Sequence, residues 1–176
     1  MSTQQHWGLD PHHSEINFKV RHMMIAHVSG SFTSFNVQAE TEGDDFSKAK
    51  VRFDADVNSI NTKNEHRDTH LKSPEFFNAE QFPKITFVST AIRPVDSGYE
   101  IEGALTVKNI SKPVTLRAEF GGIGKDPYGN TKAGFTLAGK INRNDFGLSW
   151  NAPLETGGVL VGEELNISAD IQLSKQ

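Results

Sequence analysis

Apolar and polar residues alternate along most of this chain with a period of two. Ile16, Phe18 and Val20, for example, alternate with the polar residues Asn17 and Lys19. This period predicts β-strands that are half buried, with one apolar face and one face in water. Such runs occur at 16–22, 30–40, 51–57, 85–88, 99–107, 114–120, 135–141 and 165–173. The sequence therefore predicts an all-β fold with eight strands.

Short clusters rich in Gly, Pro, Asn, Asp and Ser separate many of these runs. They are Glu42–Asp45, Pro94–Gly98, Lys108–Pro113, Asp126–Asn130 and Thr156–Gly158, and each is typical of a turn. Connections of hairpin length favour antiparallel pairing between successive strands. Because each strand has a single apolar face, these faces must meet, and a closed barrel achieves this without leaving strand edges.

Three segments depart from the regular pattern. The apolar positions of 30–40 change parity, which predicts a bulge or bend near Ser34. The glycine-rich segment Gly121–Gly124 is expected to be a loop between strands. Residues 62–72 lack period two, and Thr62 with Glu65 forms a capping box, so a short helix is predicted there, lying over one end of the barrel. Pro74 is expected to end it.

Size and charge exclude several classes of protein. A chain of 176 residues is expected to form one domain, over residues 1–176. The absence of cysteine excludes disulfides, thiolate nucleophiles and cysteine-ligated metals. A net charge of −4 argues against a dedicated nucleic-acid binder. No apolar run is long enough to span a membrane, and no secretory signal is evident, so a cytoplasmic protein is expected.

The interior of the barrel has two interpretations that the residues alone leave open. An eight-stranded barrel is either filled by side chains or holds one small ligand. The chain has 12 Phe, and strands of about seven residues span roughly 23 Å, enough for an extended acyl or prenyl chain. From their parity, the residues expected to line such a tunnel are Phe18, Val20, Phe53, Phe87, Leu105, Leu116, Phe135 and Leu137.

Polar candidates lie on the predicted helix. Arg67, Asp68 and His70 form either a head-group clamp at the barrel mouth or an ordinary salt-bridged helix surface. His66 and His70 have the i, i+4 spacing of metal ligands, but a third ligand is missing from the motif, so no metal site is expected.

Further contacts at the mouth are expected from His22 and Arg143. The segment Arg143–Gly147 is either such a contact or a turn in which Gly147 is left-handed. The apolar segment Met23–Ala26 either gates a pocket or covers a dimer seam.

Several short blocks occur in a characteristic order along the chain. They are Trp7–Asp10, His13–His22, Val28–Phe35, Val57–Thr62, Arg67–Leu71, Ser73–Phe77, Phe82–Phe87, Gly103–Val107, Lys112–Val114 and Arg143–Gly147. In order and spacing, over roughly residues 7 to 173, they resemble the YceI-like family of lipocalin-like lipid-binding proteins. The resemblance implies an extended lipocalin-like antiparallel barrel with a helix between strands, around a long apolar cavity.

The resemblance also implies a function. Members of this family are associated with polyisoprenoids or other long amphiphilic lipids, often form dimers, and in many cases are periplasmic proteins with a signal peptide. This chain looks like a leaderless member. We therefore expect a homodimer that binds a long-chain isoprenoid or a similar amphiphile, as carrier or store, with Arg67, His70, His22 and Arg143 near the head group.

Two other functions are compatible with the residues. One is an isoprenoid-modifying or hydrolytic enzyme that uses Arg67, Asp68 and His70, and the other is a stress-related interaction module with a packed barrel. The chain has neither a nucleophile-elbow motif nor a phosphate-binding glycine loop. We therefore expect no catalysis and no cofactor.

Overall fold

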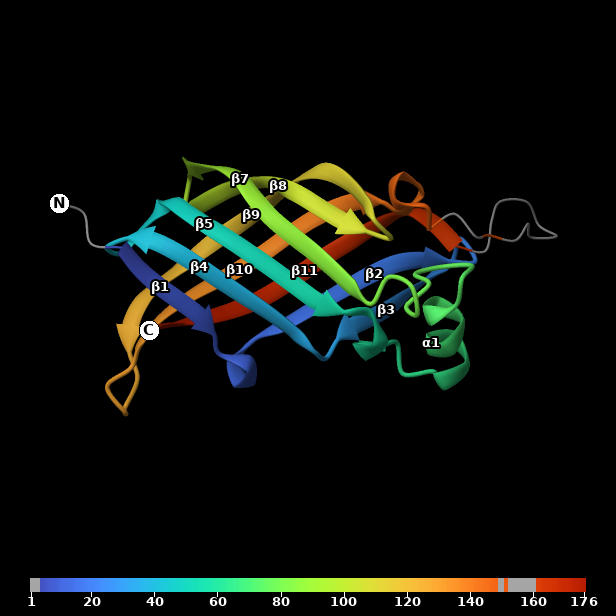
Figure 1. Cartoon of the computed structure of the whole chain (residues 1–176), viewed down its shortest axis with the longest axis horizontal. Helices are drawn as coiled ribbons and strands as arrows, with labels where there is room; N and C mark the ends of the chain where they lie inside the picture. Colours follow the sequence, from blue (N-terminus) through green and yellow to red (C-terminus); the bar gives the residue numbers. More distant parts are fainter. Residues whose placement is uncertain (1–3, 149–150, 152–160) are drawn as a thin grey trace.

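A computed structural model describes residues 4–148, 151 and 161–176, which are mainly β-strands (Figure 1). The strands are β1 Gln4–Leu9, β2 Glu15–His22, β3 Ala26–Phe32, β4 Phe35–Glu42, β5 Asp45–Asp56, β6 Ile60–Asn61, β7 Lys84–Val95, β8 Gly98–Val107, β9 Ile110–Lys125, β10 Thr131–Asn142 and β11 Val161–Lys175. The helix α1 spans Glu65–Lys72, and three 3₁₀ turns are η1 Pro11–His13, η2 Val57–Ser59 and η3 Arg143–Phe146.

Eight of the described strands form a closed antiparallel barrel. Their order is β1–β4–β5–β7–β8–β9–β10–β11, and pairing of β1 with β11 closes the ring. At this closure Trp7 lies opposite Lys175 on β11 and opposite Ala39 on β4. The predicted eight-stranded antiparallel barrel with one short helix is therefore confirmed.

Each of the other three described strands is next in sequence to a different strand of the ring. β2 continues β1 after η1 and pairs with β11 and β3, while β3 leads into β4 across Thr33 and Ser34. This interruption confirms the bend predicted near Ser34. The short strand β6 follows β5 and pairs with the end of β3, at Phe32 and Ile60. The hydrophobic pattern did not predict β1, because its sequence QQHWGL lacks the period of two.

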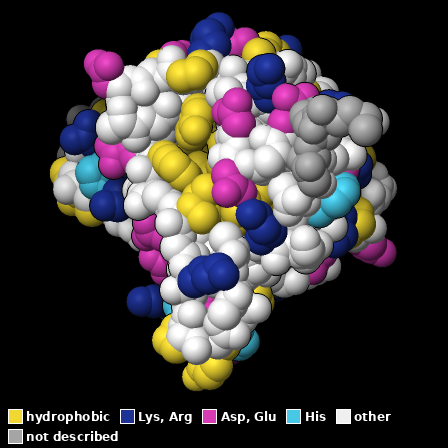
Figure 2. All heavy atoms as spheres, turned by 90° about the vertical axis from the view of Figure 1, so that its left-hand side faces the viewer, with side chains coloured by type: hydrophobic (Ala, Val, Ile, Leu, Met, Phe, Trp, Pro, Cys, Tyr) yellow, Lys and Arg dark blue, Asp and Glu magenta, His cyan; other side chains and the backbone are white. Residues whose placement is uncertain are grey.

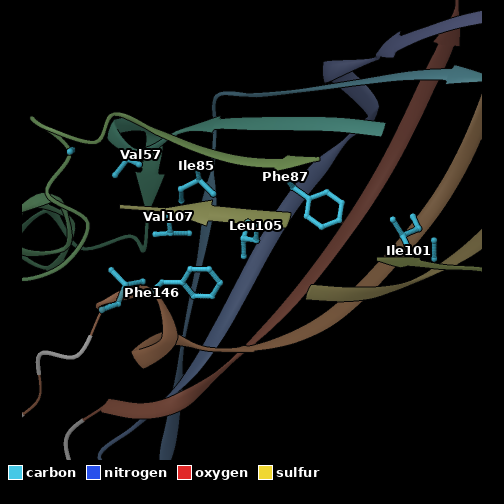
Figure 3. Close-up of a cluster of buried hydrophobic side chains, with 10 residues drawn as sticks. Val57, Ile85, Phe87, Ile101, Leu105, Val107 and Phe146 are labelled. Carbon is cyan, nitrogen blue, oxygen red and sulfur yellow. The ribbon is translucent and has the colours of Figure 1, made fainter. Parts of the chain in front are cut away.

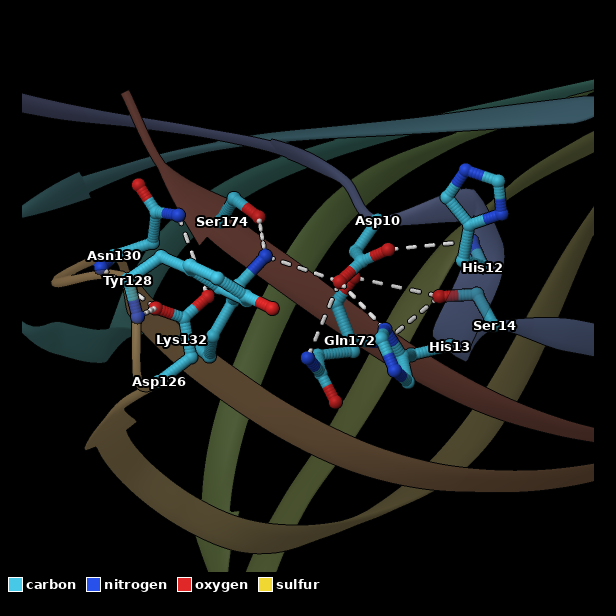
Figure 4. Close-up of polar contacts among 10 residues, drawn as sticks. All are labelled: Asp10, His12, His13, Ser14, Asp126, Tyr128, Asn130, Lys132, Gln172 and Ser174. Carbon is cyan, nitrogen blue, oxygen red and sulfur yellow. Dashed lines mark hydrogen bonds and ion pairs between the residues drawn. The ribbon is translucent and has the colours of Figure 1, made fainter.

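A polar network holds the break between β1 and β2 against β10 and β11 (Figure 4). Asp10 lies at its centre and accepts hydrogen bonds from Lys132 Nζ (3.0 Å), Gln172 Nε2 (3.2 Å) and the backbone N–H of His12 (3.2 Å). The Nδ1 atom of His13 lies 2.9 Å from the same carboxylate. Asp10 thus fastens the N-terminal segment to the C-terminal strands.

The predicted helix exists, but its predicted cap was wrong. Asn64 is the N-cap, and its side chain accepts a hydrogen bond of 3.0 Å from the N–H of Arg67. Thr62 instead donates to Asp68 Oδ1 through its backbone N–H (2.9 Å) and its hydroxyl (2.6 Å). The helix ends at Lys72, before Pro74, and lies at one end of the barrel (Figure 1).

One segment that was expected to be a loop belongs to a strand. Gly121–Gly124 is part of β9 rather than a loop, because β9 continues to pair with β10 beyond a shift in register near Gly134 and Phe135. Gly122 has a φ of 113°, which its lack of a side chain permits. The predicted turn at Thr156–Gly158 lies outside the described residues.

The inward-facing side chains form two apolar clusters along the barrel. Towards α1, Ile85 and Phe87 from β7 face Leu105 and Val107 from β8, with Phe146 beside them (Figure 3). At the other end Trp7 and Phe46 are buried with ring centroids 5.0 Å apart. Hydrophobic side chains are visible in the middle of that end of the molecule, between charged ones (Figure 2). The core thus runs along the length of the barrel.

Candidate functional site

The barrel is hollow along part of its axis. A cavity of about 270 Å³ lies towards α1, and a second of about 140 Å³ lies further in. The two cavities adjoin, because both are lined by Ile16, Phe53, Leu105 and Ile167. They lie next to each other inside the barrel, and the two together are called the interior passage below.

The smaller cavity is apolar throughout. All of its described lining residues are aliphatic or aromatic, and Tyr99 supplies the one hydroxyl group among them. Burial raises the pKa of Tyr99, with a further contribution from the charge of Asp45, so this hydroxyl is neutral at physiological pH. The rings of Phe46 and Phe135, with centroids 4.9 Å apart, belong to an aromatic cluster at this end. An apolar chain could enter this space without leaving a polar group unpaired.

The larger cavity is also mainly apolar, but it carries polar groups. Strand residues such as Phe18, Val20 and Val28 contribute to its wall, and α1 contributes Leu71. Its polar lining residues are Asn17, His22, Thr62, Arg67, His70 and Arg143. In the described parts of the chain, polarity is therefore concentrated at the α1 end of the passage.

Arg67 is held in a fixed direction by Thr62. Its Nε donates to the Thr62 hydroxyl oxygen and its Nη2 to the Thr62 carbonyl oxygen, both at 2.8 Å. Asp68 in turn accepts from Thr62, so a chain of hydrogen bonds joins the helix to the segment before it. Both contacts of the guanidinium are to neutral oxygens. It can therefore present its positive charge to a polar or anionic group in the cavity.

His70 and His66 do not form a common site. The Nε2 atom of His70 contacts the carboxylate of Glu75, and its ring lies edge-on to Phe76 with centroids 5.1 Å apart. His66 is exposed to solvent. No cluster of three His, Asp or Glu side chains suited to a metal ion occurs among the described residues.

Arg143 is buried, with 3% of its surface exposed. Its guanidinium donates to backbone carbonyls: Nε to Gly162 (2.7 Å), Nη2 to Val161 (3.2 Å) and Nη1 to Leu148. Burial lowers its pKa, against the opposing effect of the charge of Glu163. Gly147 is left-handed with a φ of 72°, so the segment Arg143–Gly147 is a turn as well as part of the cavity wall.

All twelve residues predicted from the sequence line this passage. The larger cavity contains Phe18, Val20, His22, Arg67, His70 and Arg143, the smaller contains Phe87, Leu116, Phe135 and Leu137, and Phe53 and Leu105 line both. That these side chains contact a ligand stays a prediction. Sequence reasoning missed Thr62, Phe76 and Phe77, which also line the larger cavity. They lie in irregular segments, where no alternation of apolar and polar residues indicates which side chains point inward.

Sequence comparison connects the chain with proteins of the same length. The profile of the YceI-like domain matches residues 7–173. The UPF0312 protein SAS2572 of Staphylococcus aureus strain MSSA476 is 40% identical over 166 residues, which are 94% of this chain and 95% of that protein. The UPF0312 protein SA2479 of strain N315 is 39% identical over the same shares.

Solved structures share the fold. The Campylobacter jejuni YCEI protein has a TM-score of 0.73 at 30% identity, covering 90% of this chain and 91% of that one. BcnA of Burkholderia cenocepacia has a TM-score of 0.80 at 22% identity, over 93% and 98% of the two chains. A polyisoprenoid binding domain from Saccharophagus degradans has a TM-score of 0.64 at 11% identity, over 97% and 98%. The last two show similarity of fold alone.

Proposed function

Because this chain belongs to the YceI-like domain family, we propose that it binds a long-chain isoprenoid or a similar amphiphilic lipid in its interior passage, as a carrier or store. The observation that carries this proposal is the distribution of polarity along the passage. The smaller cavity is apolar, and the polar lining residues Arg67, His70 and Arg143 all belong to the larger one. An amphiphile has the same division between tail and head.

The proposed binding mode follows from that division. The tail lies between residues such as Leu116, Phe135 and Leu137, where burial of each CH₂ group contributes about 0.8 kcal/mol before the cost of ordering the chain. The head group lies near α1, beside Arg67 and His70. The Saccharophagus degradans domain is described as polyisoprenoid binding, and its fold supports an isoprenoid as the class of ligand.

We propose binding rather than catalysis. In the enzymatic alternative Arg67, Asp68 and His70 act on a substrate, but Asp68 accepts from Thr62 and His70 contacts Glu75. Each of the three side chains therefore contacts a residue outside this group: Arg67 and Asp68 contact Thr62, and His70 contacts Glu75. The packed-barrel alternative is disfavoured by the two adjoining cavities.

The cellular setting is also part of the proposal. Within the described residues, no helix is both long and apolar enough to cross a bilayer. A cytoplasmic location, a homodimer and a single domain over residues 1–176 stay predictions, which cell fractionation, analytical ultracentrifugation and limited proteolysis would test.

Native mass spectrometry of freshly purified protein, followed by organic extraction, tests the proposal directly. We expect one lipid per chain. Leu105→Trp should abolish binding because Leu105 lines both cavities, whereas Val88→Trp adds a similar ring at an exposed position, 45% accessible, and should bind normally.

The same measurement tests the head-group assignment. Arg67→Ala should weaken retention of the extracted lipid by at least about tenfold, since a charge-assisted hydrogen bond is worth roughly 1.5–3 kcal/mol. Unchanged retention would refute the role of Arg67. A chain that is empty after purification and takes up no added prenyl lipid would refute the binding function as a whole.

A further inference from the structure

The turn between β2 and β3 presents large apolar side chains to solvent. Met23 and Met24 are 43% and 45% exposed, and Ile25 is 82% exposed. The backbone N–H of Ile25 donates to the His22 carbonyl over 3.3 Å, which closes a tight turn. Contiguous exposed apolar side chains are uncommon on a protein surface and indicate an interaction site.

The backbone of this turn makes its composition unusual. Met23 and Met24 both have positive φ, 53° and 62°, the sign pattern that a type I′ turn requires and that Asn-Gly adopts most easily. Elsewhere in the described chain, the non-glycine residues with positive φ are all polar: Lys63, Asn78, Ser97, Lys108 and Asn109. Two methionines are therefore placed where the backbone favours small polar residues or glycine.

The turn lies next to the larger cavity. Val20 and His22 on β2, and Val28 on β3, line that cavity. The alternate residues Arg21 and His27 are exposed on the outer face of the same hairpin. The hairpin thus connects the cavity wall to the exposed tip, at the end of the barrel where α1 lies (Figure 1).

We propose that Met23, Met24 and Ile25 insert into the surface of a lipid bilayer and bring the larger cavity to the membrane from which its ligand is taken. This proposal rests on the lipid-binding function proposed above, because a long-chain isoprenoid or a similar amphiphile resides in membranes. Apolar side chains that insert shallowly among lipid head groups give an affinity that scales with the apolar area they bury. They fall far short of the roughly 800 Å² per partner of a stable protein interface, so a bilayer fits the tip better than a second copy does.

The charges around the tip indicate which force dominates. Arg21 and His27 lie on the hairpin, and Glu163 and Glu164 lie on the adjacent part of β11. Because these charges are mixed in sign, apolar insertion rather than attraction to anionic lipid should provide the affinity. Binding to phosphatidylcholine vesicles should therefore change little with salt or with added phosphatidylglycerol.

Vesicle flotation with the full-length protein tests the proposal. We expect the wild type to float with phosphatidylcholine vesicles, and the triple variant Met23→Asn, Met24→Gly, Ile25→Thr to bind at least about tenfold more weakly. Asn-Gly suits a type I′ turn, so this variant should unfold at the same temperature or higher. Loss of binding would then not reflect misfolding.

A matched control removes exposed apolar surface from the opposite end. Ile123 is 38% exposed and Tyr128 is 88% exposed. Both lie towards the turn between β9 and β10, which is the lowest part of the molecule in Figures 1 and 2. The variant Ile123→Thr, Tyr128→Thr should float like the wild type.

Equal binding by the wild type and the β2–β3 variant, or no binding by either, would overturn the proposal. So would a tip variant that changes from dimer to monomer while still floating, since the tip would then join two copies.

The two proposals can fail separately. The Leu105→Trp variant, with its passage blocked, should still float, because docking needs only the tip. A wild-type protein that floats but contains no lipid by mass spectrometry, and takes up no added prenyl lipid, would contradict the cavity function and leave membrane docking in place. A protein that contains lipid but does not float would contradict docking alone.

Discussion

Asp10 shows how a single buried carboxylate can connect distant parts of a barrel. Burial by itself raises its pKa, but hydrogen bonds and charge from Lys132 and His13 more than offset this and lower the pKa to about 2, from 3.8. Lys132 also donates to Ser174 Oγ at 2.6 Å, so the network spans β10 and β11. Since the ionised form of Asp10 is favoured in the folded state, this residue makes stability depend on pH.

We predict that Asp10→Asn lowers the free energy of unfolding by up to about 2 kcal/mol near neutral pH. A depressed carboxylate pKa stabilises the fold above the unfolded value of 3.8, and the contribution is lost as pH falls towards 2. Urea unfolding at a series of pH values should therefore show the difference between wild type and variant shrinking across that window. A difference that stays constant from pH 6 to about 2 would contradict the role of the ionised group.

Parity made individual inward residues predictable, and its absence explains why Thr62 and Phe76 were missed. Phe18, Phe53 and Leu137 lie on strands that alternate regularly, so their position fixes which face they occupy. Thr62 and Phe76 lie outside such strands. Their burial depends on how the segment around α1 folds against the barrel, which no local pattern encodes.

At the scale of the element, α1 depends on its cap more than on packing. It has only eight residues, none of them buried, whereas isolated helices shorter than roughly 12 residues are marginal in water. The side chain of Asn64 satisfies one of the N–H groups at its start. Because α1 carries Arg67, His70 and Leu71 into the cavity wall, its stability bears on ligand retention.

We predict that Asn64→Ala costs about 1 kcal/mol of local stability. Hydrogen–deuterium exchange should accelerate across 65–72 while the strands stay protected, and the bound lipid should leave several times faster. Asn64→Asp preserves the capping oxygen and should behave like the wild type. If the alanine variant exchanged no faster than the wild type, the cap would not hold the helix.

Strands with strong periodicity were predicted from the sequence, whereas β1, which lacks it, was not predicted from its pattern. The regular runs on β8, β9, β10 and β11 identified their strands, because alternation reports one buried face. β1 has no such alternation and is a strand because β4 and β11 both pair with it. The capping box failed because Thr62 has a stronger partner in Asp68.

At the scale of the whole molecule, the barrel depends on the closure between β1 and β11. Trp7 lies at this closure, 1% exposed, and its Nε1 donates to the hydroxyl oxygen of Thr41 over 2.9 Å. Thr41 in turn donates to the Gly43 carbonyl over 2.6 Å. One side chain therefore contributes both to the core and to the join between the first and last strands.

We predict that Trp7→Ala lowers the free energy of unfolding by about 3–5 kcal/mol, as removal of a buried large aromatic side chain does. Trp7→Phe keeps a ring against Phe46 and should cost distinctly less. Equilibrium urea unfolding followed by far-ultraviolet circular dichroism measures both. An alanine variant within 1 kcal/mol of wild type, a rough margin for a surface change, would show that the closure does not need this residue.

The closure has a consequence for how the protein is made. β11 follows all the other described strands in sequence, and its Lys175 pairs with Trp7 on β1. A ribosome must therefore release β11 before the ring can close, and until then the apolar faces of the earlier strands have no enclosed interior to pack in. The interior can therefore form only once β11 has emerged, and the earlier strands should need protection from aggregation until then.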